Sequence, residues 1–440
     1  MKHVFSTNRR ISPWAWIPTL YFVEGIPYFI VNNISIIMFA RMGMSNGDIG
    51  MYTSLLYIPW VIKPLWSPFV DIIKTKRWWI VSTQVLMAVA LAFIALAIPR
   101  PSAEEISSGM SVSPFIVSLI VFWVTAFASA THDIAADGYY MLALDTRSQS
   151  FFVGIRSTFY RLASVFGQGV LVYIAGVLEK TLGDIPAAWS VTLTVSSILL
   201  GVIAIYHTFV LPHPVNDAVR VPSGERYGKF LSIIRESGRT FYTFFKKKGI
   251  VLSLLFLLLY RLPEAFLVKM LNPFLLASAG QGGLGMSTDM VGIAYGTAGA
   301  AALIVGGILG GIAAAKWGLK KVIWPMAMSL ALPCAVFVYL SMTQTDNIWV
   351  ITSCICLDQL GYGFGFTAYM LYMIHFSEGE FKTSHYSLCT AFMALSMMLP
   401  GMVAGYLQEW LGYVNFFWMV MLCCMATLIV TFFVKSRLPR

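Results

Sequence analysis

Charged residues are scarce in this chain of 440 residues, because Asp, Glu, Lys and Arg together make up only 11% of it. Soluble domains contain about 25% charged and roughly 45–50% apolar residues, whereas 58% of this sequence is hydrophobic. A soluble globular protein is therefore excluded. The short segments of alternating polarity that build outer-membrane barrels are also missing. The composition predicts an all-α integral membrane protein.

Patterns that carry enzyme chemistry are missing as well. The six cysteines follow no metal-binding spacing and fall in apolar runs, where we expect them to pack as small apolar residues. No Ser-His-Asp, zinc or phosphate-loop pattern occurs. His132 and Asp137 match the H-x-x-x-x-D signature of lipid acyltransferases, but residues five apart on a helix lie about 140° apart around its axis. We therefore predict no enzyme activity, no metal and no cofactor.

Long apolar runs recur along the whole sequence, and each could form a helix across a hydrocarbon core of about 30 Å. The first run is too long for the core of a signal peptide, and no small-residue cleavage site follows it, so we expect it to remain as the first span. Twelve membrane-spanning helices are predicted, at about residues 14–39, 49–70, 78–98, 115–143, 151–177, 188–211, 249–277, 290–314, 321–341, 348–375, 384–408 and 413–434.

The net charge of +10 could indicate nucleic-acid binding, but the placement of the basic residues favours a membrane topology. With the N-terminus in the cytoplasm, most Lys and Arg residues fall in cytoplasmic segments. The external loops then carry only Arg41, Arg100 and Lys180. This distribution follows the positive-inside rule. It predicts that both termini are cytoplasmic and that no nucleic acid is bound.

The longest polar segment divides the twelve predicted spans into two groups of six. We predict an N-terminal six-helix bundle at residues 1–211, a basic cytoplasmic linker at 212–248 and a C-terminal six-helix bundle at 249–440.

The two predicted halves echo each other in sequence. Glu24 and Asn32 of the first half recur at one common offset as Glu264 and Asn272 of the second. Two pseudo-symmetric six-helix bundles are the arrangement of the major facilitator superfamily. We therefore predict the major facilitator fold.

A short basic turn joins the second and third spans of each half, at residues 67–77 and 311–321. The second turn resembles the conserved cytoplasmic loop motif of that superfamily, with Ala315 where an acid is usual. In the first turn the acid is present, as Asp71. From the resemblance we expect a gating loop that contains Asp71, Lys74 and Arg77.

Nine ionisable residues other than histidine lie well inside the predicted spans, and only on spans 1, 2, 4, 5, 7 and 10. Charges inside a membrane normally face a bundle interior or an aqueous cavity. A snorkelling Lys63 and a purely structural ion pair for Glu24 remain open alternatives. Five acids stand against four bases, so we expect one carboxylate to hold a proton. The nine are Glu24, Lys63, Asp133, Asp137, Arg161, Arg261, Glu264, Lys269 and Asp358.

Two of these acids, Asp133 and Asp137, are four residues apart and therefore share one helix face at a separation of about 6 Å. Two carboxylates this close cannot both ionise cheaply away from water, so we expect coupled titration of the pair. Arg161 on the next span is expected to hold one acid ionised. The alternative is that arginines bridge both acids permanently. His132 lies off the acid face and either packs locally or relays protons.

The stretch 130-ATHDIAADGYYML-142 is similar to the Q-D-x-x-x-D-[GA]-W signature of the peptide–acetyl-CoA transporter family, a branch of the major facilitator superfamily. Asp133 and Asp137 match the paired acids of that signature, whereas His132 and Tyr139 replace its glutamine and tryptophan. The resemblance extends over all twelve predicted spans through 63-KPLWSPFVD-71, 259-LYRLPEAF-266, 358-DQLGYGFG-365 and 401-GMVAGYLQEWLG-412.

Within that family the sequence resembles the bacterial muropeptide permeases most. The resemblance implies a monomeric proton symporter of the bacterial inner membrane that imports N-acetylglucosaminyl-anhydromuramyl peptides for cell-wall recycling. Its partners would be a small-molecule substrate, protons and the lipid bilayer, and Asp133 and Asp137 would couple the proton. Alternatives are another bulky solute, such as a glycan fragment, a CoA ester or a siderophore, or a non-transporting receptor. The expected substrate-binding residues are Glu24, Tyr139, Arg161, Arg261, Glu264, Lys269, Asp358 and Tyr362.

Overall fold

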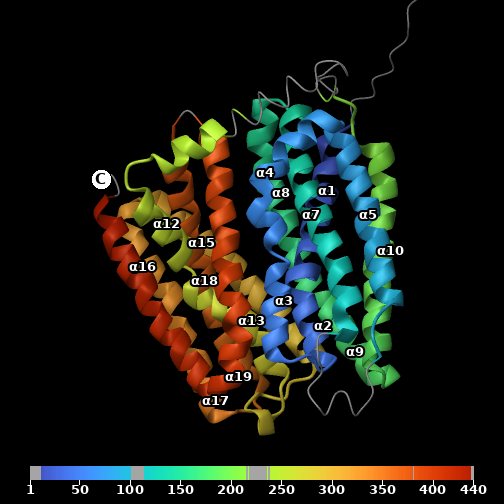
Figure 1. The fold of residues 1–440 in the computed structure, drawn as a ribbon, viewed down its shortest axis with the longest axis vertical. Helices are drawn as coiled ribbons and strands as arrows, with labels where there is room; N and C mark the ends of the chain where they lie inside the picture. The colour runs from blue at the N-terminus through green and yellow to red at the C-terminus, as the bar shows by residue number, and fades with distance from the viewer. Residues whose placement is uncertain are drawn as a thin grey trace, which may run out of the picture.

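The computed structural model describes residues 11–100, 113–214, 217, 235, 238–379 and 381–437, and their regular structure is helical. The helices gather in two bundles, one from the N-terminal and one from the C-terminal part of the chain, that stand side by side (Figure 1). A helix satisfies all its backbone hydrogen bonds internally, which is what a segment in hydrocarbon requires.

The N-terminal bundle contains α1 (Pro13–Phe29), α2 (Ser35–Arg41), α3 (Asn46–Leu55), α4 (Ile58–Ile73), α5 (Lys76–Leu96), α7 (Ile116–Ala143), α8 (Thr146–Val165), α9 (Val172–Leu182) and α10 (Ile185–Val210). The C-terminal bundle contains α12 (Ile250–Leu259), α13 (Leu262–Leu276), α14 (Thr288–Val291), α15 (Ala300–Trp317), α16 (Leu319–Ala331), α17 (Ala335–Thr343), α18 (Ile348–Ser377) and α19 (Lys382–Arg437).

Several predicted spans are interrupted near their middle. A π-helical turn at Ile30–Ile34 separates α1 from α2, and another at Phe166–Leu171 separates α8 from α9. The seventh span breaks at Arg261, two residues before Pro263 in the first turn of α13. Such breaks in membrane helices are tolerated where they are buried in protein or line a cavity.

Nine helical segments within the described ranges are long and apolar enough to cross a membrane. One of them, Ser384–Arg437, contains the non-helical Gly412 at φ 72° and comprises the last two predicted spans. The prediction of a multi-pass helical membrane protein is confirmed. The count of twelve spans and the position of the termini stay predictions.

We name the two membrane faces by what they carry. The linker face holds the ends of α10 and α12 that adjoin segment 212–248 and is uppermost in Figure 1. The loop face is the opposite one and holds the turns 42–45, 183–184 and 277–287.

The two bundles meet near the loop face. Asn46 donates hydrogen bonds to Gln408 at 2.6 Å and to Tyr413 at 3.0 Å, and Lys180 forms an ion pair with Asp289 at 2.7 Å.

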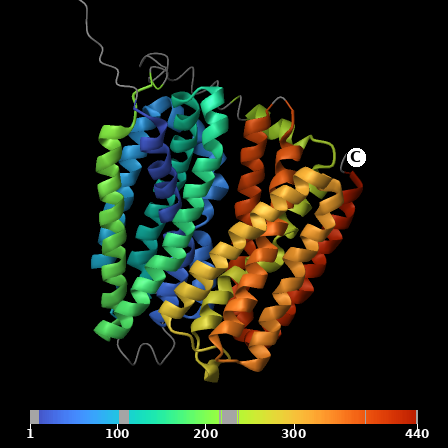
Figure 2. The same ribbon diagram turned by 180° about the vertical axis from the view of Figure 1, so that it is seen from behind.

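Two glycines show how closely the backbones approach in this contact. A Cβ atom on Gly296 would lie 1.8 Å from the carbonyl oxygen of Gln168, and one on Gly405 would lie 1.7 Å from that of Asn46. Toward the linker face the ribbons of the two bundles diverge (Figure 2). The molecule is therefore sealed at the loop face.

Candidate functional site

Three carboxylates converge inside the N-terminal bundle. They come from Glu24 on α1 and from Asp133 and Asp137 on α7, and one carboxylate oxygen of each lies within 4.8 Å of the others. The spacing of four residues on α7 brings the two aspartates to one side of the helix, as the sequence predicts. Glu24 joins them because α1 packs against α7. Such a cluster of negative charge requires neighbouring cations.

Two basic side chains supply that charge. The ammonium of Lys63 on α4 donates to Asp133, and the guanidinium of Arg156 on α8 lies 2.7 Å from Asp137. Arg156 also lies over the ring of Tyr21, at 4.5 Å from its centroid. The interpretation of Lys63 as a snorkelling residue is therefore wrong, because its ammonium is used within the bundle.

Arg156 is the partner that the sequence interpretation missed. The prediction that Arg161 holds one of the aspartates is wrong for this structure. The guanidinium of Arg161 instead lies across the gap to the other bundle, 3.3 Å from the position of a Cβ on Gly307 of α15. Among the described residues it has no ion-pair partner, so Arg161 is available to a ligand between the bundles.

Glu24 is the member of the cluster that forms no ion pair with a described residue. Its side chain is buried, and its Oε2 has no hydrogen-bond partner among the described residues. Arg156 adds a fifth base to the intramembrane tally, so the predicted overall excess of one carboxylate is wrong. Locally, however, the basic partners of these three carboxylates among the described residues are Lys63 and Arg156. The excess acid of this cluster is Glu24.

Four side chains of the cluster are partly exposed. The side chains of Lys63, Asp133, Arg156 and Asp137 are 21%, 22%, 28% and 41% exposed. Charged groups at this depth do not face lipid at acceptable cost. Their exposed surface therefore faces the space between the diverging bundles.

His132 takes no part in the acid cluster. It is fully buried, and its Nε2 lies 2.9 Å from the side-chain amide of Gln84, which in turn lies 3.0 Å from His207 on α10. Thr19 completes the chain at 2.9 Å from the second nitrogen of His207. These contacts tie α1, α5, α7 and α10 together, so His132 packs the bundle on the side away from Asp133.

The C-terminal bundle contains a second polar site around Arg261, at the break between α12 and α13. Its guanidinium donates to the hydroxyl of Tyr362 and lies 4.8 Å from the ring centroid of Phe366 and 5.8 Å from that of Tyr369. Its Nε has no partner among the described residues. Aromatic faces hold the cation in place and leave donor capacity unused.

Two further acids lie deep in the same bundle. Glu264 and Asp358 are each only 2% exposed, and Asp358 accepts a hydrogen bond from Gln359 at 3.1 Å. Both predicted acids thus lie beside the Arg261 site, but neither is open to solvent in this structure.

An apolar and aromatic cluster joins the two polar sites. Tyr28 of α1 and Tyr57 of the N-terminal bundle pack with Ala265 of α13 and Met397 of α19. Trp60 meets Tyr28 edge to face, with their ring centroids 5.2 Å apart. Aromatic faces between two charged sites suit a ligand that has both sugar rings and charged groups.

Tyr139 lies outside this site. It is fully buried, its hydroxyl donates to the carbonyl oxygen of Pro212 at 2.6 Å, and its ring packs against Trp16 at 5.2 Å. Both ends of the side chain are therefore used in packing near the linker face.

The predicted gating loop lies at the linker face. Arg77 binds the carbonyl oxygen of Leu211 at 3.2 Å, and the ammonium of Lys74 lies 5.9 Å from the ring of Trp78. The backbone N–H of Arg77 donates to Asp217 at 3.0 Å, a linker contact that the sequence did not predict. The side chain of Asp71 lies outside the described part of the chain.

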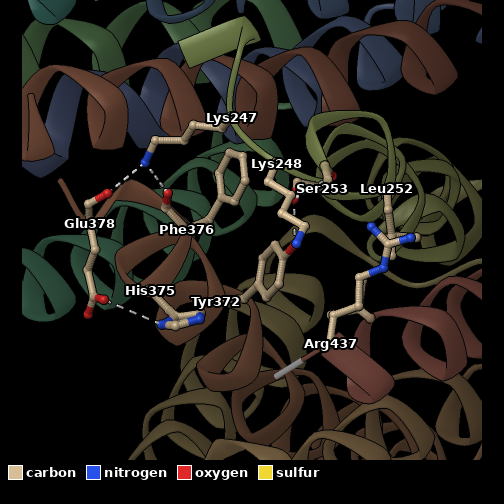
Figure 3. A pocket seen from close by; sticks show the side chains of 11 residues that line it. Lys247, Lys248, Leu252, Ser253, Tyr372, His375, Phe376, Glu378 and Arg437 are labelled. Atoms are coloured by element: carbon tan, nitrogen blue, oxygen red, sulfur yellow. Dashed lines mark hydrogen bonds and ion pairs between the residues drawn. The ribbon is translucent and has the colours of Figure 1, made fainter. Parts of the chain in front are cut away.

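A cavity of about 300 Å³ lies at the linker face of the C-terminal bundle (Figure 3). Lys247 projects from one wall and donates to the carbonyl oxygens of Phe376 and Glu378, which end α18. The carboxylate of Glu378 lies 3.7 Å from His375. Burial lowers the pKa of the Lys247 ammonium from its usual value. These contacts fix the linker to a helix end, far from the intramembrane acids.

Known proteins resemble this chain over nearly its whole length. The anhydromuropeptide permease of Escherichia coli K12 is 26% identical over 90% of this chain and 74% of its own. A putative transporter, AmpG 1, of Rickettsia bellii is 24% identical over 95% and 97% of the two chains. The crystal structure of a D-xylose-proton symporter has the same fold, with a TM-score of 0.71 at 11% identity and 97% coverage of both chains.

The family comparison agrees with the predicted fold and with a membrane transporter rather than an enzyme. The model of the Major Facilitator Superfamily matches residues 19–380. The protein is a multi-pass transporter of the inner membrane, and its chain belongs to the major facilitator superfamily.

Proposed function

We propose that this transporter is a proton symporter that carries an anhydromuropeptide, a cell-wall-derived sugar–peptide, into the cytoplasm. Glu24 is the observation that supports proton coupling most directly. It is a buried carboxylate in a cluster of three acids and two bases. A carboxylate without a counter-charge in such surroundings favours a bound proton.

The proposed proton site is therefore broader than the aspartate pair expected from the sequence. Asp133 and Asp137 each have a basic partner and set the negative field around Glu24. A proton on Glu24 would relieve the repulsion among the three carboxylates. Loss of that proton would restore the repulsion. The free energy needed to rearrange the two bundles would therefore differ between protonated and deprotonated Glu24.

The proposed substrate rests on the name of the Escherichia coli relative and on the chemistry of the site. A peptide carboxylate would find Arg261, whose Nε has no partner among the described residues, and Arg161, which lies beside Gly307 of the other bundle. Arginine binds carboxylates through paired hydrogen bonds. The sugar rings would pack on the aromatic side chains of Tyr28 and Trp60. Glu264, Asp358 and Tyr362 would complete the pocket on the other bundle.

The proposed cycle follows alternating access. We assign the linker face to the cytoplasm because the basic residues gather there. The structure, sealed at the loop face, would then be the inward-facing state. Rocking of the halves 1–211 and 249–440 about the site would open the loop face to the periplasm. We propose that one chain suffices for this cycle.

Uptake into proteoliposomes tests this function. Purified anhydromuropeptide labelled on the sugar is offered at acidic external pH, with and without a protonophore. Accumulation that the protonophore abolishes supports the proposal. A glycan fragment without peptide, a CoA ester and a siderophore are offered in parallel. Uptake of one of these in place of the muropeptide would reject the proposed substrate but retain the carrier.

A further inference from the structure

Lys269 is a fully buried lysine without an acidic partner among the described residues. It lies on α13, toward the loop face, and its ammonium donates to the hydroxyl of Thr53 on α3 at 3.0 Å. The Thr53 hydroxyl itself donates to the carbonyl oxygen of Ile49 at 2.6 Å, so it accepts from the lysine. The ring of Tyr57 lies 5.1 Å from the ammonium. Among the described residues, one hydroxyl and one aromatic face are thus the polar contacts of this ammonium.

The contact leaves polar groups unused. An ammonium has three N–H donors, and the described residues accept only one hydrogen bond from Lys269. Ser54, the residue after Thr53, is fully buried, and its hydroxyl has no hydrogen-bond partner in the part of the chain that the structure describes. A Cβ on Gly401 of α19 would lie 2.4 Å from that hydroxyl oxygen and 3.1 Å from Cε of Lys269. Both groups therefore pack against the same glycine.

Unsatisfied buried polar groups are rare in proteins, and each requires an explanation. These lie together in the contact between the two bundles. The contact is next to the hydrogen bonds from Asn46 to Gln408 and Tyr413 near the loop face. Separation of the bundles at this face would uncover Lys269, Ser54 and Tyr57 together. These polar groups lack hydrogen-bond partners while the loop face is sealed. They could bind a ligand when the loop face is open.

We propose that Lys269, together with Ser54, captures a carboxylate of the incoming ligand when the loop face is open. This step rests on the proposed function, and it assigns Lys269 to one conformation only. Closure of the loop face transfers the ammonium to Thr53 and withdraws it from the ligand. The carboxylate then passes to Arg261, eight residues earlier on the same span and about 12 Å deeper by helical rise. Affinity for the anion therefore falls as the site turns inward.

Initial uptake rates into proteoliposomes of uniform orientation test this step. The ligand is anhydromuropeptide with free carboxylates or the same compound with its carboxylates amidated. Lys269→Met is expected to raise KM for the acidic ligand about tenfold, the loss of one charge-assisted hydrogen bond, and to leave KM for the amidated ligand near the wild-type value. Lys269→Arg keeps the charge and should restore most of the affinity.

Thr53→Val is the matched control, because it removes the hydrogen bond of the sealed state and keeps the lysine. A merely structural role for Lys269 predicts the same kinetic change in Thr53→Val as in Lys269→Met. The proposal predicts a near wild-type KM for Thr53→Val. Equal changes for acidic and amidated ligands in Lys269→Met would overturn it.

Labelling with a membrane-impermeant amine-reactive ester tests the exposure of Lys269 without any ligand. Mass spectrometry is expected to find label on Lys269 from the loop-face side, with Lys180, whose side chain is 55% exposed there, as the positive control. Label on Lys180 alone would overturn the proposal. If the wild type transports no muropeptide but Lys269 is labelled, the proposed substrate fails while the exposure step stands.

Discussion

The ion pair between Arg156 and Asp137 should contribute a measurable coupling free energy, and Arg161, which forms no such pair among the described residues, provides the control. Arg156→Met removes a guanidinium that lies 2.7 Å from Asp137 and 4.5 Å from the ring centroid of Tyr21. The two charged side chains are 28% and 41% exposed, so the pair is intermediate between a surface pair and a buried one. Surface pairs contribute about 0–1 kcal/mol, and breaking a buried pair costs about 3–5 kcal/mol. We expect a coupling free energy of about 1–3 kcal/mol.

A double-mutant cycle measures this coupling. The free energy of unfolding in mixed micelles is determined for the wild type, Arg156→Met, Asp137→Asn and the double variant. The same cycle with Arg161→Met is the control, and its coupling to Asp137 is expected to stay below about 0.5 kcal/mol. A coupling of Arg161 to Asp137 as large as that of Arg156 would refute the geometry of the cluster.

Three further predictions concern the proton site and the sealed face. Glu24→Gln should keep ligand counterflow but lose gradient-driven accumulation, since a neutral amide cannot exchange a proton. Comparison of the two assays in one vesicle preparation checks this, and loss of both would show a general defect. Gly296→Ala places a methyl 1.8 Å from the carbonyl oxygen of Gln168, so it should prevent full closure and lower uptake at least about tenfold. A cross-link between cysteines at 180 and 289 should form more slowly in that variant, and wild-type uptake would contradict this packing. Lys180→Met should lower the free energy of unfolding by about 1–3 kcal/mol, because Lys180 is 55% exposed but the Asp289 side chain that it leaves without a partner is only 11% exposed. No measurable loss in micelles would contradict the burial of Asp289.

The length and placement of apolar runs predicted the fold well, because a membrane span requires about 20 apolar residues. The interruptions were not predicted. The π-helical turns at Ile30–Ile34 and Phe166–Leu171 each lie in an apolar run that also contains an amide residue, Asn32 and Asn33 in the first and Gln168 in the second. Helix breaks of this kind leave hydropathy unchanged.

The aspartate pair followed from helical spacing, whereas its basic partner did not. Arg156 lies close to the predicted cytoplasmic end of its span and was counted with the loop charges. The turn at residues 144–145 reverses the chain between α7 and α8, and α1 packs against both helices, so residues at similar distances from the turn lie at similar depths. Arg161 is five residues further along and about 7.5 Å deeper than Arg156. A comparison of distances from this turn could therefore have identified Arg156, which a count of charges per span did not.

The third acid was harder to foresee. Glu24 lies on a different helix, more than a hundred residues away in sequence from Asp133, and only the packing of α1 on α7 shows that the three carboxylates share one site. For Tyr139 the prediction was wrong in the opposite way. Its place in a family signature suggested contact with the ligand, but its hydroxyl donates a hydrogen bond to the carbonyl oxygen of Pro212.

The most direct test of the proposal is a measurement of proton movement with the ligand. Anhydromuropeptide is added to weakly buffered proteoliposomes that contain an internal pH dye and no imposed gradient. Ligand-dependent acidification of the interior is predicted for the wild type, and none for Glu24→Gln. Uptake of the labelled muropeptide without any change of internal pH in the wild type would contradict proton coupling.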